Sequence, residues 1–519
     1  MSETTRRAVT LRAPLAGALC WAMVTAAWPA WAADAPATTV SIGSGTLAGQ
    51  TADGVRRFLG IPYAAPPIGP RRWQPPQPPA SWSGVREATA FGPACPQPGI
   101  RAFGNIPGPQ SEDCLYLNVW APASATPDHP LPVMVWIYGG AHRIGAASLP
   151  YYDGSELARR GVVLVSFNYR LGYLGYFAHP ALGAEGGGNF GLMDESAALK
   201  WVQANIAAFG GDPKNVTVFG ESAGGADVLY LMTGPAGRGL FQRAIVESGG
   251  GWNSPLSRTA MVGKVLADLR KIGLPDKLDA QALRKLDAHQ LIEAQNGDRS
   301  FGFGPFLDGR TVNAAPYRVF EKGGEAAVPL IVGSNGWEAS LLEFRDVGWM
   351  GRALSYLPPF AFWYQGQAQN ASQRRAMIFD DSFAASARWL ARKHSRRAPA
   401  WVYEFDHVSA GLRGKVPGAG HGAEVPYVFD TLDATPRLAR NTDADDRRLA
   451  AALADCWAAF AASGTPRCAL ADWPPYDPQT RKVLRIDGAA RVRSDPQADQ
   501  LSKIEYWFGP GGWLGPHGR

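Results

Sequence analysis

The 519-residue sequence is 46% hydrophobic and 11% aromatic, which is enough apolar material to bury a large core. Its formal net charge is only +6, and the chain has no long run of Lys or Arg. Nucleic-acid binding and attachment to a membrane surface are therefore not expected. No internal repeat or low-complexity tract divides the chain into several domains.

The N-terminal residues have the pattern of a secretory signal peptide. Three arginines within the first twelve residues precede an apolar run at 15–30, which ends in a small-x-small cleavage site. The sequence therefore predicts a cleaved signal peptide at 1–32, one catalytic domain at 33–519, and export to the periplasm or medium of a bacterium. The adjacent Arg6 and Arg7 leave the twin-arginine route open beside the general one. No other segment has the length and apolar character of a membrane span.

The expected elements start with a long Pro-rich loop at 66–79 and alternate between strand and helix from about residue 131. Near-continuous apolar runs predict strands buried on both faces, at 131–138, 161–169, 215–220, 243–248, 329–335 and 401–405. Apolar residues at helical spacing predict helices at 194–209 and 226–233. The alternation predicts an α/β fold with a doubly wound, mostly parallel central sheet. The regions 251–300 and 341–400 are expected to be helical insertions that cap this sheet.

Four cysteines follow the predicted signal peptide, namely Cys95, Cys114, Cys456 and Cys468. An even number in an oxidising compartment predicts two disulfides, for which three pairings are possible. The simplest pairing joins neighbours in the sequence and closes two short loops. Their spacings do not resemble a zinc site, so no metal is expected.

The sequence VTVFGESAGGADV at 216–228 runs a β-branched strand directly into a Gly-Glu-Ser-Ala-Gly motif. The glycines leave room for a tight strand-to-helix turn that presents the hydroxyl of Ser222 above the sheet. The first amides and the dipole of the following helix favour a developing negative charge at the same point. The pattern predicts a nucleophile elbow at Ser222. Glu221 is either a second acid near the site or a buried hydrogen-bonding residue behind the turn.

A serine nucleophile needs a base and an acid that orients the base, and in this fold both follow the serine. His421 lies in the glycine-rich segment GAGHGAEVPYVF, after the last predicted core strand, and is the predicted base. His407 is the alternative base. Glu338 follows the strand at 329–335 and is the predicted acid. Asp308 is the alternative acid, although its Asp-Gly sequence also suits a simple turn.

The strand at 131–138 ends in a segment that we call the glycine loop, residues 139–145 (GGAHRIG). Small residues at the carboxyl end of a strand can direct free backbone amides at a reacting carbonyl. The amides of Gly140 and Ala141, with that of Ala223, are predicted to form an oxyanion hole.

These motifs resemble those of the type-B carboxylesterases, an α/β-hydrolase family that includes cholinesterases and bacterial para-nitrobenzyl-type esterases. FGGDPKNVTVFGESAG at 209–224 and EDCLYLNVWAP at 112–122 match two signatures of that family. The similarity extends from about residue 38 to about residue 480. It implies the Cys95–Cys114 bridge, because Cys114 lies in the second signature.

The same resemblance implies Ser222 as nucleophile, Glu338 as acid and His421 as base. It further implies hydrolysis of a small-molecule carboxylic ester through an acyl-enzyme, without a cofactor. Hydrolysis of amides or lactones and acyl transfer need the same residues and stay open as alternatives. A non-catalytic binding protein on this scaffold is disfavoured because all three triad residues are present.

The sequence departs from the family pattern at three places. The glycine loop has His142 where the family has an aromatic residue, which is expected to change the polarity of the pocket. The acid is flanked by Trp337 and Ala339 in place of Asp and Gly. The loop between Cys95 and Cys114 contains no tryptophan, whose ring holds the quaternary ammonium of choline in cholinesterases. A choline ester is therefore not the expected substrate.

Several aromatic residues at 341–364 could line an apolar substrate pocket or could belong to the core, which is the commoner situation. They include Phe344, Trp349, Phe360, Phe362 and Trp363.

Overall fold

The computed structural model describes residues 37–99, 106–183, 187–295, 303–343, 352–353 and 355–516. The predicted signal peptide lies outside these ranges. Residues 36–519 form one compact unit. Within the ranges described, every helix is too short or too polar to cross a membrane.

Seven parallel strands form the centre of a large sheet, in the order β7-β6-β10-β11-β12-β13-β14. They are β6 (Leu131–Ile137), β7 (Val163–Phe167), β10 (Gly211–Glu221), β11 (Arg243–Glu247), β12 (Leu330–Asn335), β13 (Ala400–Phe405) and β14 (Lys482–Ile486). The first six coincide with the predicted strands, because a strand covered on both faces must be apolar throughout. The α/β fold with a mostly parallel sheet is thereby confirmed.

Antiparallel strands extend the sheet at both ends, where the sequence did not predict strands. They are β1 (Ala37–Ile42), β2 (Gly45–Ala52), β3 (Val55–Pro62), β5 (Tyr116–Pro122) and β15 (Ala490–Ser494), and the short β4 (Val85–Glu87) pairs with β2 in parallel. These strands carry polar residues among apolar ones, so their patterns are weaker than those of the central strands.

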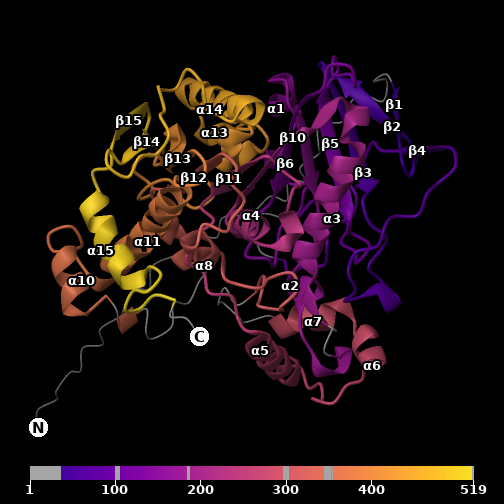
Figure 1. Cartoon of the computed structure of the whole chain (residues 1–519), viewed down its shortest axis with the longest axis horizontal. Helices are drawn as coiled ribbons and strands as arrows, with labels where there is room; N and C mark the ends of the chain where they lie inside the picture. The colour runs from indigo at the N-terminus through magenta and orange to yellow at the C-terminus, as the bar shows by residue number, and fades with distance from the viewer. Residues whose placement is uncertain are drawn as a thin grey trace, which may run out of the picture. The chain divides into compact units, whose positions relative to one another are not determined.

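Helices pack on both faces of the sheet (Figure 1). One connected set contains α3 (Phe190–Asn205), α4 (Ala223–Thr233), α8 (Pro316–Glu321) and α11 (Ala371–His394). The other contains α1 (Ser155–Arg159), α12 (Val425–Val428) and α14 (Ala444–Ser463). The remaining short elements are α2 (Gly172–Gly175), α13 (Pro436–Asn441) and a small pair of strands, β8 (Tyr176–Phe177) and β9 (Gly188–Asn189).

The two predicted insertions behave differently. In the first, α5 (Arg258–Lys271), α6 (Ala280–Arg284) and α7 (Ala288–Gln295) lie together away from the central strands (Figure 1). They pack around a small second core that they share with Trp73 and with buried residues between 173 and 190. In the second, the prediction of a cap was wrong for α11. This helix packs directly on β12 and β13, and its C-terminal half is buried at 384–391, where most residues are small or apolar.

The aromatic residues predicted either as pocket or as core are mostly core where the structure describes them. Phe360 on α10 (Pro358–Trp363) is fully buried against Trp507 and Phe508 of α15 (Ala498–Phe508). Trp363 also packs against Trp507, whereas Phe362 is exposed. Phe344 and Trp349 lie outside the described residues.

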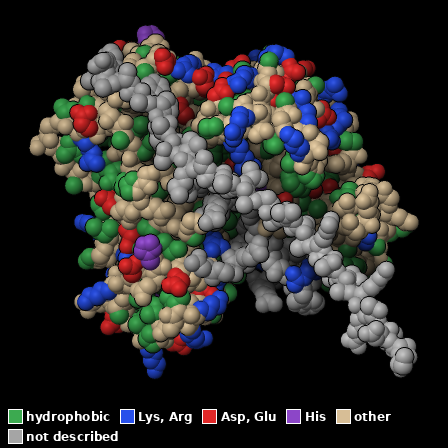
Figure 2. Space-filling model, turned by 180° about the vertical axis from the view of Figure 1, so that it is seen from behind, with side chains coloured by type: hydrophobic (Ala, Val, Ile, Leu, Met, Phe, Trp, Pro, Cys, Tyr) green, Lys and Arg blue, Asp and Glu red, His purple; other side chains and the backbone are tan. Residues whose placement is uncertain are grey.

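Two disulfides join the four cysteines in the pairs that the sequence predicted. Cys95 pairs with Cys114 and Cys456 pairs with Cys468, with Cα–Cα distances of 5.0 and 4.9 Å. On the face shown in Figure 2, Lys and Arg side chains are interspersed with Asp and Glu, in agreement with the small net charge.

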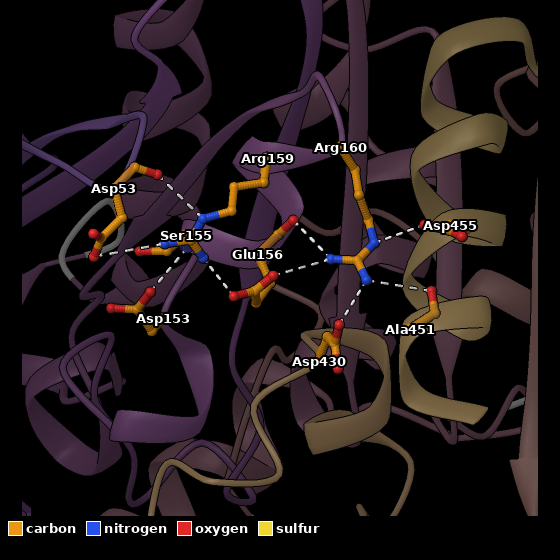
Figure 3. A network of polar contacts seen from close by, with 9 residues as sticks. All are labelled: Asp53, Asp153, Ser155, Glu156, Arg159, Arg160, Asp430, Ala451 and Asp455. Atoms are coloured by element: carbon orange, nitrogen blue, oxygen red, sulfur yellow. Dashed lines mark hydrogen bonds and ion pairs between the residues drawn. The ribbon is translucent and has the colours of Figure 1, made fainter. Parts of the chain in front are cut away.

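Arg160, which follows α1, joins this helix to the C-terminal part of the chain (Figure 3). Its guanidinium donates to Oδ2 of Asp430 at 2.6 Å and to Oδ1 of Asp455 at 2.7 Å. Asp455 lies on α14, and Asp430 follows α12, the short helix next to the candidate base. The contacts of Arg160 therefore hold the segment around α12 against α1.

Replacing Arg160 by alanine is expected to lower the free energy of unfolding by about 1–3 kcal/mol, because the charge-assisted hydrogen bonds to Asp430 and Asp455 are lost. The neighbouring Arg159 is the control, since it contacts Asp53 and Glu156 at the exposed surface. Arg159→Ala should cost less than about 1 kcal/mol. Urea-induced unfolding of both variants measures the difference, and equal losses would contradict this role of Arg160.

Candidate active site

Ser222 is the single residue between the end of β10 and the start of α4. Its backbone has φ 56° and ψ −119°, which is an unfavourable conformation for a residue with a side chain. Its amide donates to the carbonyl of Glu247 on β11 at 2.8 Å, and its carbonyl accepts from Ala226 at 2.9 Å. The strand, the helix and the neighbouring strand together hold the strained turn.

The two glycines of the motif are required by close backbone contacts. A Cβ added at Gly224 would lie 2.0 Å from the carbonyl oxygen of Ile137 on β6. A Cβ added at Gly220 would lie 2.6 Å from the carbonyl carbon of Gly224. Because these atoms belong to the backbone, they cannot move aside for a side chain. This is the crowding that the sequence pattern led us to expect around Ser222.

Glu338 and His421 are in direct contact. Oε2 of Glu338 lies 2.5 Å from Nδ1 of the His421 ring. The other carboxylate oxygen accepts hydrogen bonds from the hydroxyl of Ser248 at 2.6 Å and from the amide of Asn335 at 2.7 Å. Glu338 is completely buried, so its position is fixed by these three partners.

The segment that carries His421 is tied to the segment that carries Glu338. The amide of His421 donates to Oγ of Ser340 at 2.9 Å, and the amide of Trp337 donates to the carbonyl of Ala419 at 2.8 Å. The side-chain amide of Asn335 donates to the carbonyl of Gly420, also at 2.8 Å. His421 follows β13, the last strand that the sequence predicted, whereas β14 comes later in the chain, was not predicted and extends the parallel sheet.

The second ring nitrogen of His421 faces the turn that contains Ser222. Nε2 lies 3.1 Å from Oε1 of Glu221 but does not form a hydrogen bond within the described part of the chain. A Cβ added at the next residue, Gly422, would lie 3.3 Å from the same oxygen. The imidazole therefore packs against the residue that immediately precedes Ser222.

The glycine loop also packs against this turn. A Cβ added at Gly139 would lie 2.9 Å from Cβ of Ser222. Among the residues with assigned positions, the amides of Gly140 and Ala141 do not donate to a backbone or side-chain acceptor. The amide of Ala223 belongs to the first turn of α4 and has no acceptor within the helix. All three amides are available to bind a negatively charged oxygen.

Gln97 connects the glycine loop to the first disulfide. Its Oε1 accepts from the amide of Gly145 at 2.7 Å. Its Nε2 donates to the carbonyls of Gly145 at 2.8 Å and Cys95 at 3.0 Å. The Cys95–Cys114 bridge thus supports the C-terminal end of the glycine loop through one side chain.

The two alternative residues are engaged in other contacts. Oδ1 of Asp308 accepts from three successive backbone amides, those of residues 310, 311 and 312, and so stabilises a turn. Nε2 of His407 lies 2.6 Å from Oδ1 of Asp446, which also accepts from the hydroxyl of Tyr427 at 3.0 Å. Both residues have structural contacts that involve neither Ser222 nor its neighbours.

Buried carboxyl groups surround the imidazole and determine its protonation. Burial by itself would lower the pKa of His421, but the charges of Glu221 and Glu338 outweigh this effect and raise the pKa to about 9. Burial raises the pKa of Glu221 to about 7, although the nearby His421 ring opposes this rise. Burial likewise raises the pKa of Glu424 to about 8, and Glu221 adds to the increase.

Sequence reasoning missed the residues that support the candidate acid. Besides Ser248 and Asn335, Asp380 on α11 accepts from the amide of Ala339 at 2.6 Å. Glu424 contacts the side-chain amide of Asn335. Only Glu424 could have been identified from the sequence, because it lies three residues after His421 in the same motif. The others come from separate elements that meet only in the folded chain.

Comparison with known proteins gives several similar esterases. A model of the carboxylesterase family matches residues 36–349 and 360–504. Para-nitrobenzyl esterase of Bacillus subtilis (strain 168) is 38% identical over 480 residues, which cover 89% of this chain and 97% of that protein. Fumonisin B1 esterase of Sphingopyxis macrogoltabida is 37% identical over 483 residues, 84% of each chain. A solved PNB esterase structure has a TM-score of 0.80 at 35% identity and covers 90% of this chain and 99% of its own.

Replacing Glu221 by glutamine is expected to lower the pKa of His421. Glu221, with a pKa of about 7, is ionised over the range where His421 titrates, and its negative charge favours the protonated ring. The low-field Nδ1–H signal in a proton NMR titration reports this pKa. The control is Glu424→Gln, because Glu424 contributes less to the shift at His421. A larger decrease for Glu424→Gln than for Glu221→Gln would contradict the electrostatic assignment.

Proposed function

The chain belongs to the type-B carboxylesterase family and is a carboxylic ester hydrolase, and we propose that Ser222, His421 and Glu338 form its catalytic triad. The observation that carries this proposal is the 2.5 Å contact between Glu338 and His421, on a ring whose other nitrogen faces the residue before Ser222. The acid fixes the imidazole through Nδ1 and leaves Nε2 free to exchange a proton with a hydroxyl.

In the first half of the proposed reaction, Nε2 of His421 takes the proton of Ser222 while Oγ attacks the ester carbonyl. The electron pair of the carbonyl double bond moves to its oxygen, and the amides of Gly140, Ala141 and Ala223 bind the resulting oxyanion. When the tetrahedral intermediate collapses, His421 gives the proton to the leaving alcohol. The product of this half is an ester between Ser222 and the acyl group.

In the second half, water takes the place of the alcohol. The water oxygen attacks the acyl-enzyme while His421 removes a proton from that water molecule, and the same amides bind the second oxyanion. Collapse returns the proton to Ser222 and releases the carboxylic acid. Because His421 accepts a proton only when its ring is neutral, a pKa of about 9 implies that kcat/KM rises with pH through the neutral range.

The proposed substrate is a small-molecule ester. Relatives that cover most of the chain are named as esterases of two different substrates, a para-nitrobenzyl ester and fumonisin B1. The proposed triad and amides could act on either kind of substrate, because they contact only the reacting carbonyl and the leaving oxygen.

We also infer that residues 33–519 form one exported catalytic domain. The compact unit at 36–519 and the two disulfides support this proposal, because disulfides persist in oxidising compartments. Cell fractionation of a bacterial host that expresses the full chain tests export. The expected result is a protein in the periplasm or medium whose N-terminus is Ala33.

Ser222→Ala is expected to lower kcat for para-nitrophenyl butyrate by about 10⁴-fold or more, because the nucleophile is absent. Glu338→Gln should lower kcat by about 10³–10⁴-fold, since it disturbs the orientation of His421. Asp308→Asn is the matched control and should stay within about twofold of the wild type, because asparagine keeps the turn-forming oxygen. Undiminished hydrolysis by Ser222→Ala would remove the proposed triad.

An acyl-enzyme intermediate predicts a burst of para-nitrophenol when the wild-type enzyme meets para-nitrophenyl acetate in stopped flow. The burst amplitude should approach one equivalent per active site if deacylation is the slower step, and Ser222→Ala should show no burst. Mass spectrometry of the quenched wild-type protein should find the acetyl group on Ser222. Acetylation at another residue would contradict the mechanism.

A further inference from the structure

His142 in the glycine loop contacts a buried carboxylate. Its Nε2 lies 3.0 Å from Oδ1 and 2.9 Å from Oδ2 of Asp227. The ring is almost completely buried, with 6% of the residue exposed, and Asp227 is fully buried. Because an ionised carboxylate can only accept hydrogen bonds, Nε2 carries the ring proton and donates a hydrogen bond to Asp227. The ring of His142 therefore points toward α4, the helix that follows Ser222.

Asp227 lies on α4, one helical turn after Ala223. Residues four positions apart lie on the same face of a helix, so Asp227 stands directly behind the first turn of α4. His142 is the next residue after Ala141 in the glycine loop. The His142–Asp227 contact therefore joins the loop that supplies two candidate amides to the helix turn that supplies the third.

The glycine loop needs such a restraint because its backbone is strained. Ala141 has φ 54° and His142 has φ 57°, so two successive residues with side chains are in the left-handed region. Residues in this conformation persist only when the surrounding structure holds them there. The carbonyl of His142 accepts from the amide of Gly172 at 2.7 Å, which fixes the backbone, whereas Asp227 fixes the side chain.

The surroundings of the pair leave the ring little freedom. Tyr176 meets the imidazole edge to face, with ring centroids 5.1 Å apart. A Cβ added at Gly304 would lie 2.6 Å from Nδ1, so a backbone segment packs against that side of the ring. Glu195 on α3 is also fully buried, and burial raises its pKa well above the usual range, with a further contribution from the charge of Asp227. A protonated Glu195 can act as a second donor to Asp227.

We infer that His142 is a positioning residue, which holds the amides of Gly140 and Ala141 at a fixed place relative to Ser222 by donating a hydrogen bond to Asp227. This role rests on the proposed function, because it assumes that these amides bind the oxyanion. The effect should appear in the transition state, where the oxyanion forms, and not in the binding of the uncharged ester.

His142→Phe removes the donor and keeps an aromatic ring. It is expected to lower kcat for para-nitrophenyl butyrate by about 10–100-fold while KM changes by less than about threefold, because displaced amides stabilise the oxyanion less well. His142→Gln keeps an N–H donor and should recover most of the lost kcat. An equal loss in both variants would show that ring packing, and not the hydrogen bond, is the requirement, and would overturn the proposal.

A trifluoromethyl ketone provides a second readout. Ser222 Oγ adds to its carbonyl carbon, the carbonyl electron pair moves to oxygen, and the serine proton passes to His421, which gives a stable oxyanion. The inhibition constant of His142→Phe should increase by the same factor by which kcat/KM falls. If Ser222→Ala no longer binds the ketone while His142→Phe binds it as tightly as the wild type, the triad stands and the positioning role is wrong.

A double-mutant cycle with Asp227→Asn tests whether the two residues act through one contact. The double variant His142→Phe/Asp227→Asn should lose no more activity than the worse single variant, whereas multiplied losses would overturn the proposal. His394→Phe is the structural control, because His394 forms a similar buried contact with Glu325 at 3.0 Å, near the amino end of β12. It should lower the melting temperature without changing kcat or the inhibition constant.

Discussion

The structure of the site depends on the conversion of β10 into α4 within a single residue. Parallel strands end at one edge of a sheet, so the segments that follow β6, β10, β11 and β12 meet there. At this edge the backbone around Gly224 touches that of Ile137, and Gly139 touches the side chain of Ser222. The nucleophile turn and the glycine loop are consequently one packed unit. A displacement of either would change the distance between the hydroxyl and the amides that serve it.

The second determinant is the burial of several carboxyl groups around one imidazole. Glu338 accepts three hydrogen bonds, one of them from His421, so it is the carboxyl of this group best satisfied as an acceptor. Burial raises the pKa of Glu221 to about 7 and that of Glu424 to about 8, and the charges of both carboxyl groups act on the ring. Both groups can be uncharged when the ring is charged, and they ionise at higher pH. The imidazole therefore experiences a negative environment whose strength depends on pH.

The sequence predicted the parts of the fold that have a local signal. The central strands are apolar throughout, and the turn at Ser222 is specified by adjacent glycines. It did not predict β3, because the adjacent Arg56 and Arg57 interrupt the apolar pattern of this strand. Arg56 nevertheless donates to the carbonyl of Ala125 inside the fold. It also misjudged α11, because Arg388 suggests solvent exposure but is buried between Glu404 and Asp495. A charged residue whose partner is distant in the sequence cannot be recognised as buried from its neighbours in the chain.

Asp227 illustrates the same limit at the site itself. An acid within an apolar helix gives no indication of its partner, which lies 85 positions earlier in the sequence. The departure at His142 was visible, but it suggested a change in pocket polarity, whereas the ring donates to the helix behind the loop. A buried carboxylate without a donor is costly, and so is a buried imidazole without an acceptor. An aromatic residue at position 142 would leave Asp227 without this donor, so the two positions are under one physical constraint and can change without penalty only together.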